Sequence, residues 1–336
     1  MKKIIRVLLV LALLLIAGLA VYMATFEPAR RPAPGEKVEI TPARVERGRY
    51  LAHHVTDCFG CHADRDWTRY AGPVKGRPGA GGGCLTAQMG APGLVCAPNI
   101  TPDVDTGLGS WTDGEILRAT REGIGRDGEA LFPLMPYEEF RRMSDEDARS
   151  IVAYLRTVEP VRSSPPRTNL DFPVGFFIKM VPKPLDGPVP EPDRTDSVRH
   201  GEYLADIAGC KFCHSPVDRK QQVIPGRLLS GGHTFQGPWG VVSAPNLTPH
   251  ETGLGDRSRR SRLEFIAIFR SFSDPMTVAA RVEDGKDGRN TPMPWYAYAG
   301  MTDADLGAIY DYLHSLPPVE NRVERFPRAA SETASR

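Results

Sequence analysis

The chain carries two pentapeptides of the form Cys-x-x-Cys-His. Two thiols spaced this way on one helical turn reach both vinyl groups of a single porphyrin, and the imidazole next to them then faces the iron. The spacing therefore predicts covalent attachment of a c-type haem at each pentapeptide. The predicted attachment residues and iron ligands are Cys58, Cys61 and His62 in the first copy and Cys210, Cys213 and His214 in the second.

A longer repeat surrounds these pentapeptides in the 336-residue chain. In both copies Gly-x-Tyr-Leu-Ala precedes the pentapeptide, and Ala-Pro-Asn-x-Thr-Pro, Thr-Gly-Leu-Gly and Met-Pro come after it in the same order. Each copy closes with a helix signal, which begins after Ser144 or Thr302. The repeat disfavours a zinc site or a redox pair and predicts a mainly α fold of two tandem cytochrome c domains. We expect each domain to be a few helices around one covalently bound haem, with its own core.

The same repeat predicts the second axial ligand of each iron. Met135 lies 73 residues after His62, and Met293 lies 79 residues after His214. Prolines beside each methionine stiffen its loop, so that little ordering entropy is lost when the thioether binds iron. Four other methionines are interpreted as core residues; they are Met89, Met143, Met276 and Met301.

Two further features concern the haem-ligating histidines. His53 and His54 lie one turn before the first motif and are rival ligands, but the second copy has no imidazole there, so they are interpreted as surface or propionate-side residues. The carbonyls of Pro98 and Pro245 are expected to accept the Nδ1 hydrogen bond that orients each haem-ligating histidine.

The N-terminus reads as a targeting segment. Lys2, Lys3 and Arg6 precede an apolar run from Val7 to about Phe26, and such a run covers roughly the ~30 Å hydrocarbon thickness of a bilayer. Basic residues before the run place the rest of the chain outside the cytoplasm. We therefore expect an uncleaved anchor in a bacterial inner membrane with the haem domains in the periplasm; a cleaved signal peptide is the alternative.

The sequence predicts two domains, with a tether before the first and a linker between them. Residues 27–43 are interpreted as an extended tether, and the linker between the domains contains an apolar island from Phe172 to Ile178. The island is too short to span a membrane; by default it packs in the crevice between the domains, and docking onto a partner or the membrane surface is the alternative. The ranges are 1–26 (anchor or signal), 27–43 (tether), 44–161 (first domain), 162–195 (Pro-rich linker), 196–320 (second domain) and 321–336 (disordered tail).

Cysteine, glycine and charge patterns add four smaller predictions. Cys84 and Cys96, twelve residues apart, have no counterparts in the second copy and are expected to form a disulfide worth about 3 kcal/mol. Lys and Arg (42) nearly balance Asp and Glu (41), so no nucleic-acid partner is expected. Gly123–Gly128 fits a dinucleotide-binding pattern but comes after a helix signal and is interpreted as a turn. The basic cluster of Arg257, Arg259, Arg260 and Arg262 is interpreted by default as a solvated helix face, and docking of an acidic protein or anionic lipid is the alternative.

The Gly48-x-Tyr50-Leu51 segment, the Asn99–Asp103 motif, Met135-Pro136-Tyr137 and the Asn169–Pro173 linker resemble the membrane-bound cytochrome c subunits of bacterial alcohol, aldehyde and gluconate dehydrogenases. The resemblance covers about residues 45–320 and implies class I cytochrome c domains. It also implies electron transfer from a periplasmic dehydrogenase subunit to quinone or a terminal oxidase. Those subunits typically carry three haem motifs, whereas this chain carries two, which predicts two covalently bound haem c.

Two His/Met-ligated haems leave no open iron position, so the residues predict outer-sphere electron transfer and no catalytic residue of the chain's own. Two alternatives stay open. One is a dihaem cytochrome c peroxidase-like enzyme, in which one iron must bind substrate. The other is a free-standing electron carrier that serves several donors.

Overall fold

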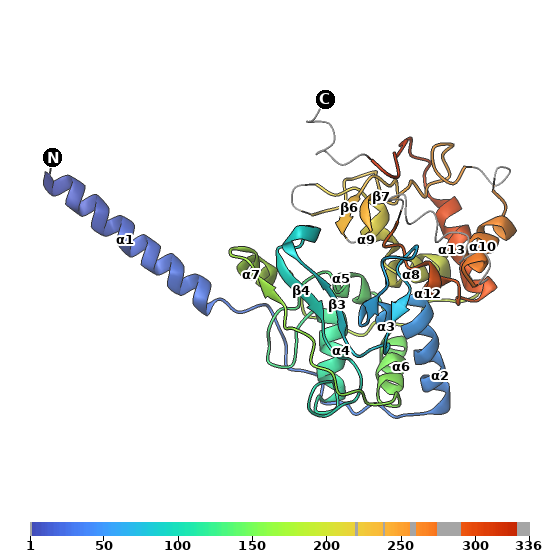
Figure 1. Ribbon diagram of the computed structural model, residues 1–336, viewed down its shortest axis with the longest axis horizontal. Coiled ribbons are helices and arrows are strands. Elements are labelled where there is room, and N and C mark those ends of the chain that lie inside the picture. The colour runs from blue at the N-terminus through green and yellow to red at the C-terminus, as the bar shows by residue number, and fades with distance from the viewer. Residues whose placement is uncertain (1, 219–220, 238, 256–259, 274–289, 328–336) are drawn as a thin grey trace.

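The computed structural model describes residues 2–218, 221–237, 239–255, 260–273 and 290–327. An isolated helix, α1 (Lys2–Thr25), projects from a folded body in which two similar sets of short helices lie against one another (Figure 1). The first set is α2 (Pro42–Tyr50), η1 (Leu51–Val55), α3 (Cys58–Cys61), α4 (Asp113–Glu122), α5 (Tyr137–Phe140) and α6 (Asp145–Leu155). The second is α8 (Ser197–Ile207), α9 (Cys210–His214), α10 (Arg262–Arg270), α12 (Trp295–Tyr298) and α13 (Asp303–Ser315). We call residues 42–161 the first half and residues 197–319 the second half.

The first and last helices of each half cross at a glycine. A Cβ atom built on Gly48 of α2 would lie 1.9 Å from the backbone oxygen of Ser150 in α6, and one built on Gly201 of α8 would lie 1.9 Å from that of Ala308 in α13. No side chain fits such a distance. The glycine of the repeated Gly-x-Tyr-Leu motif is therefore needed for the close approach of the two helices.

Between this glycine and the first cysteine of the haem motif, the first half contains one residue more than the second. Cys58 comes ten positions after Gly48, whereas Cys210 comes nine positions after Gly201. The extra residue is absorbed by η1, a short π-helix, where the second half continues as regular α-helix. A π-helical turn accommodates one added residue without shifting the residues on either side. The histidine pair, His53 and His54, lies in this π-helix, and the corresponding part of the second half has no histidine.

The helix starts agree with the sequence signals. Thr112 caps α4 with a complete capping box to Glu115, and Ser144 and Thr302 cap α6 and α13 through their side chains. Gly123 ends α4 in a left-handed conformation (φ 72°), so the Gly123–Gly128 pattern is a turn after a helix, as predicted. Of the basic cluster, Arg257 and Arg259 lie outside the described residues, and Arg262 is the first residue of α10.

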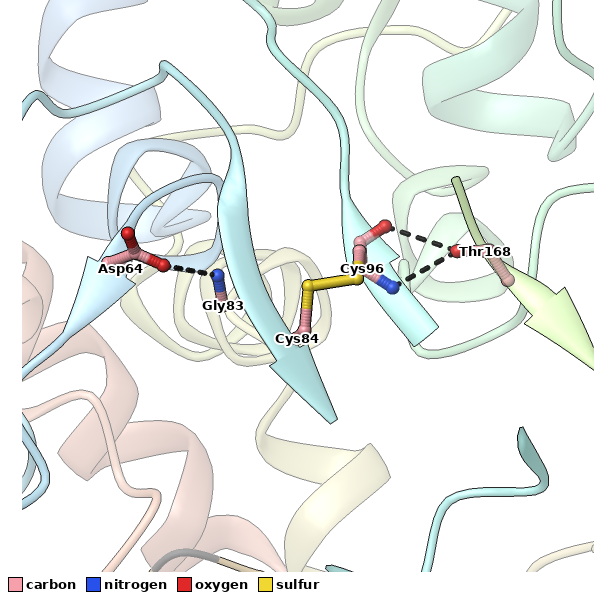
Figure 2. The surroundings of a disulfide bond; sticks show 5 residues. All are labelled: Asp64, Gly83, Cys84, Cys96 and Thr168. Atoms are coloured by element: carbon pink, nitrogen blue, oxygen red, sulfur yellow. Dashed lines mark hydrogen bonds between the residues drawn. A yellow bond between two sulfur atoms is a disulfide. The ribbon is translucent and has the colours of Figure 1, made fainter. Parts of the chain in front are cut away.

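Short strands hold the loops around the helices. They are β1 (Asp64–Arg65) with β2 (Val74–Lys75), β3 (Gly82–Leu85) with β4 (Gly93–Ala97) and β5 (Asn169–Leu170), and β6 (Thr234–Gly237) with β7 (Gly240–Ser243), all antiparallel. The turn η2 (Ala87–Met89) joins β3 to β4. The predicted disulfide is present: Cys84 and Cys96 join β3 to β4 (Figure 2). Thr168 bonds to both the N–H and the carbonyl of Cys96, which ties the start of the linker to the same sheet.

The segment interpreted as a tether is packed more closely than the sequence indicated. It lies against α4: Val38 is buried, its N–H donates to Asp113 (2.8 Å), and Arg31 pairs with Glu122 (2.8 Å). These contacts are long-range, and no local pattern encodes them.

The apolar island does not fill a crevice between the halves. It forms α7 (Val174–Phe177) and η3 (Ile178–Met180), and Phe176 packs against Tyr22 and Phe26 at the C-terminal end of α1. The default interpretation of this segment was therefore wrong.

The two halves contact each other through matched tyrosines. Tyr203 of α8 donates to Asp147 Oδ2 at the start of α6 (2.7 Å) and accepts from the Ser144 N–H (3.2 Å). In the opposite direction, Tyr50 of α2 donates to Asp305 Oδ2 at the start of α13 (2.5 Å) and accepts from the Thr302 N–H (3.1 Å). We call these the reciprocal tyrosine contacts. Each half thus binds the N-terminal turn of the other half's last helix with its own Gly-x-Tyr-Leu tyrosine.

Each acidic residue in these contacts has a second partner. Arg47 forms a two-pronged ion pair with Asp147 (2.8 Å for both bonds), and His200 bonds to Asp305 (2.9 Å), so each of these partners comes from the same half as the carboxyl it binds. Burial opposes ionisation of Asp305, but the bonds from His200 and Tyr50 outweigh it and hold the pKa of this carboxyl below its usual 3.8. One hydrophobic core runs across the interface and includes Leu51, Ile151, Leu204 and Leu313.

Candidate haem-attachment sites

Each Cys-x-x-Cys-His pentapeptide forms a single tight turn that begins after a left-handed residue. Asp57 (φ 49°) precedes α3 and Gly209 (φ 70°) precedes α9, so the chain enters both turns in the same way. Burial raises the pKa of the Cys58 thiol to about 11 and that of Cys210 to about 12. An apolar environment disfavours the thiolate, so these thiols are poor redox nucleophiles.

A backbone carbonyl fixes the imidazole at the end of each turn. His62 Nδ1 lies 2.7 Å from the Pro98 carbonyl oxygen, and His214 Nδ1 lies 2.9 Å from that of Pro245. A carbonyl only accepts, so Nδ1 carries the proton and Nε2 keeps its lone pair for a metal. The two predicted hydrogen bonds are thus present, one in each half. Both histidines are buried.

The residue after each of these prolines is an asparagine that closes its half. Asn99 Nδ2 donates to the Val161 carbonyl (2.7 Å), and Asn246 Nδ2 donates to the Val319 carbonyl (2.8 Å). The oxygen of each amide accepts from the backbone N–H of the threonine two residues later, Thr101 or Thr248. The repeated Pro-Asn-x-Thr motif therefore positions the carbonyl that holds the histidine and pins the end of the same half.

The two predicted methionine ligands occupy matching positions. Met135 and Met293 each precede a proline and a short helix, α5 or α12, and both are half-buried. They pack against the same hydrophobic cluster that Cys58 and Cys210 contact. Met143 and Met301 are fully buried, in agreement with their interpretation as core residues; Met276 lies outside the described residues.

The rival histidines have other partners. His53 Nε2 bonds to the Tyr154 hydroxyl (2.8 Å), and its ring stacks on Phe59. Burial lowers the pKa of His53 to about 4, so the ring is neutral. His54 Nδ1 bonds to the Ala297 carbonyl of α12 in the other half (3.2 Å). Both are half-buried packing residues at or near the interface between the halves.

The short helix after the second methionine faces the haem motifs of both halves. Tyr298 of α12 is buried, and its hydroxyl donates to the Ala208 carbonyl. Burial raises the pKa of Tyr298 well above 10, and cysteines of both motifs, Cys210 and Cys61 among them, raise it further. Tyr298 therefore lies near the attachment turns of both halves.

Glu139 lies on α5, the short helix of the first half that corresponds to α12. Burial raises the pKa of Glu139 to about 7, and the nearby carboxyls of Glu138 and Asp206 raise it as well. Its charge also acts on Cys213 of the second motif. Sequence reasoning missed Tyr298 and Glu139, because their importance lies in contacts between the halves.

Two thiols and an imidazole with a free Nε2 on one turn are the groups that covalent haem attachment uses. In keeping with this, residues 45–159 match the family model named Cytochrome c. Members of the family bind haem c covalently and transfer electrons.

The chain is similar over most of its length to cytochrome subunits of dehydrogenases. It is 31% identical over 316 residues to the fructose dehydrogenase cytochrome subunit of Gluconobacter japonicus (90% of this chain, 57% of the relative). It is 28% identical over 301 residues to the cytochrome c subunit of the quinone-dependent alcohol dehydrogenase of Gluconobacter oxydans strain 621H (82% and 55%). The chain thus spans little more than half the length of these relatives.

A third relative has nearly the same extent as this chain. The dihaem c-type cytochrome of Cereibacter sphaeroides is 28% identical over 317 residues, which are 92% of this chain and 97% of the relative. A chain of this size with two haem motifs therefore has a counterpart described as a dihaem cytochrome.

Proposed function

We propose that the chain is a membrane-anchored electron-transfer protein with two haem c groups, held in tandem class I cytochrome c domains at residues 44–161 and 196–320. The observation that carries the proposal is the pair of Cys-x-x-Cys-His turns, each with its histidine Nδ1 bonded to a proline carbonyl. The helices, the contacts between the halves and the Pro-Asn-x-Thr motif recur around both turns, which supports a duplicated domain.

The residues have specific roles in this proposal. Cys58 and Cys61 in the first domain, and Cys210 and Cys213 in the second, form the thioether bonds. His62 and Met135 would hold the first iron, and His214 and Met293 would hold the second. When bound, a haem with His/Met ligation supplies one-electron chemistry at a potential higher than a second histidine would give.

The protein's own contribution is positioning. The proline carbonyls hold each imidazole in one orientation, and the reciprocal tyrosine contacts fix one domain against the other. Tyr298 is buried near both attachment turns. The two redox sites are therefore held at a constant separation and orientation, which serves electron transfer without any group at the site having to move.

The proposed partner and location rest on the relatives and on α1. Among the described residues, α1 is the one helix long and apolar enough to cross a membrane. We propose that it stays attached as an anchor in a bacterial inner membrane, with the haem domains in the periplasm. We propose a periplasmic dehydrogenase catalytic subunit as the electron donor, because two relatives are named as cytochrome subunits of dehydrogenases, and quinone or a terminal oxidase as the acceptor.

Haem content tests the central claim. The purified chain is expected to carry two haems by alkaline pyridine spectroscopy and intact mass, and Cys58→Ala/Cys61→Ala and Cys210→Ala/Cys213→Ala variants are expected to carry one each. Cys84→Ala/Cys96→Ala is the matched control and keeps both haems. A chain with one haem, or with haem that acid acetone extracts, contradicts the proposal.

The methionine ligands are tested separately. Met135→Leu and Met293→Leu are each expected to abolish the near-infrared charge-transfer band of one ferric His/Met haem and to lower that haem's potential. The control is Met143→Leu, at a fully buried core methionine. A high-spin haem in the unaltered protein at rest, together with peroxide turnover, would instead support the peroxidase-like alternative.

A free-standing carrier is the second candidate, favoured by the dihaem relative that matches this chain's length. Purification from detergent-solubilised membranes discriminates between the two. Copurification with a quinoprotein or flavoprotein dehydrogenase supports the subunit function. Its absence from every fraction, with reduction of the isolated chain by several donors, supports the carrier.

A further inference from the structure

Three large apolar side chains are exposed close together in the segment Phe172–Met180. Phe172, Phe177 and Met180 have exposed fractions of 77%, 54% and 48%. They belong to the short helices α7 and η3 and the turn before them, which come directly after the strand β5 and are held to the first half by its pairing with β4. A patch of this kind on a well-ordered segment marks a surface that is covered in the working protein.

The segment lies at the C-terminal end of α1. The Phe176 ring is 6.2 Å from that of Tyr22 and 5.5 Å from that of Phe26, measured between centroids. Lys179 Nζ donates to the Phe26 carbonyl (3.0 Å), at the point where the chain leaves the helix. Figure 1 shows α7 beside the base of α1, between that helix and the rest of the body.

This position corresponds to a definite depth in a bilayer. A helix of 24 residues is about 36 Å long, against a hydrocarbon thickness of about 30 Å. Tyr22 and Phe26 therefore fall at the membrane–water boundary on the side of the haem domains. Aromatic side chains favour this boundary, and a lysine stem can pass along the apolar layer while its ammonium stays in water.

We propose that the segment Phe172–Met180 is a second membrane-contact site, inserted into the outer boundary of the bilayer that α1 spans. The occupant of the apolar surface is lipid, because the surface is continuous with the end of the spanning helix through Phe176. The inference rests on the proposed retention of α1 as an anchor. Contact at two points prevents the haem domains from rotating freely about α1, so that one face is always directed to the membrane.

The test uses the full-length chain in nanodiscs that contain a phospholipid with a photoreactive diazirine near its headgroup. After illumination, labelled peptides are identified by mass spectrometry. The segment around residues 172–180 is expected to be labelled together with the C-terminal turn of α1. The internal control is the region around Leu263, which is 78% exposed on α10 in the second half and is expected to stay unlabelled.

Two variants sharpen the result. Phe172→Ser/Phe177→Ser is expected to reduce labelling of the segment at least fivefold and to leave labelling of α1 and haem absorbance unchanged. Leu263→Ser, the matched control, changes neither. Labelling of α1 without labelling of the segment overturns the proposal, as does protection of the segment by a copurified dehydrogenase or by a second copy of the chain.

Intact mass of the purified chain separates this inference from the proposed function. A mass that lacks the first 25 or so residues refutes retention of α1. In that case the processed chain is mixed with vesicles of the same photoreactive lipid. Labelling of Phe172–Met180 then still supports the membrane contact, and its absence rejects it.

Discussion

Replacing Tyr203 with phenylalanine removes one hydroxyl from the interface between the two halves. This hydroxyl donates to Asp147 Oδ2 at 2.7 Å and accepts from the Ser144 N–H at 3.2 Å. Asp147 and Ser144 are 1% and 0% exposed, so water cannot replace the lost partner. Asp147 keeps its ion pair with Arg47, and the variant therefore leaves no isolated buried charge.

The size of the effect depends on these environments. A hydrogen bond from a neutral hydroxyl to a buried carboxylate contributes about 2 kcal/mol, and a buried N–H that loses its acceptor costs about 1 kcal/mol more. Tyr203→Phe is thus expected to lower the free energy of unfolding by about 3 kcal/mol. Tyr50→Phe removes the equivalent hydroxyl beside Thr302, which is exposed, and is expected to cost only about 1 kcal/mol, because water satisfies the groups left behind.

The two variants form a matched pair for measurement. Urea unfolding of the haem-loaded chain, monitored by far-ultraviolet circular dichroism, gives the two free energies, and limited proteolysis reports whether the halves separate first. An equal effect of both variants, or a larger effect of Tyr50→Phe, would refute the reasoning, since burial is the property that makes the two otherwise equivalent contacts unequal. A loss under about 0.5 kcal/mol for Tyr203→Phe would do the same.

Three further predictions concern other parts of the molecule. Gly48→Ala places a methyl group 1.9 Å from the facing backbone oxygen and is expected to cost about 3 kcal/mol or to prevent folding, measured as soluble haem-loaded yield and unfolding free energy. Cys84→Ser/Cys96→Ser opens a twelve-residue loop and is expected to cost about 3 kcal/mol, a difference that should disappear when both proteins are reduced. Glu139, whose pKa burial raises to about 7, loses its proton as pH rises through that value. The negative charge near Cys213 then favours the ferric state, so the potential of the second haem is expected to fall by tens of millivolts around neutral pH in the unaltered protein and to stay flat in Glu139→Gln; parallel pH profiles would contradict this.

Local signals in the sequence were sufficient for several features. The Cys-x-x-Cys-His spacing, the capped helix starts and the turn at Gly123 depend on residues within one or two helical turns, and the structure has them as expected. The disulfide and the two proline carbonyls that hold His62 and His214 were predicted by comparison of the copies. The two prolines belong to a motif that both copies share. The two disulfide cysteines occur in the first copy only.

Contacts between distant segments were not predictable in this way. The packing of residues 27–40 on α4 and of Phe176 on α1 depends on side chains some 75 or more positions apart that share no periodic pattern. Tyr50 and Tyr203 were visible as repeated residues, yet a repeat does not say whether each copy binds its own acidic partner or its neighbour's. The extra residue of the first half was visible as a difference in spacing. The π-helix that accommodates it was not, because it depends on two fixed points: the crossing of α2 and α6 before it and the haem motif after it.

The reciprocal tyrosine contacts have the form of an isologous interface, in which residue i of one unit meets residue j of the other and j meets i. Two identical single-haem chains would make the same pair of contacts across a dimer axis. A linker of some 35 residues holds the two surfaces at a high effective concentration, so their association does not depend on how much protein the cell contains. Because the two surfaces are covalently joined, they have been free to diverge: Arg47 supports the contact on one side and His200 supports it on the other.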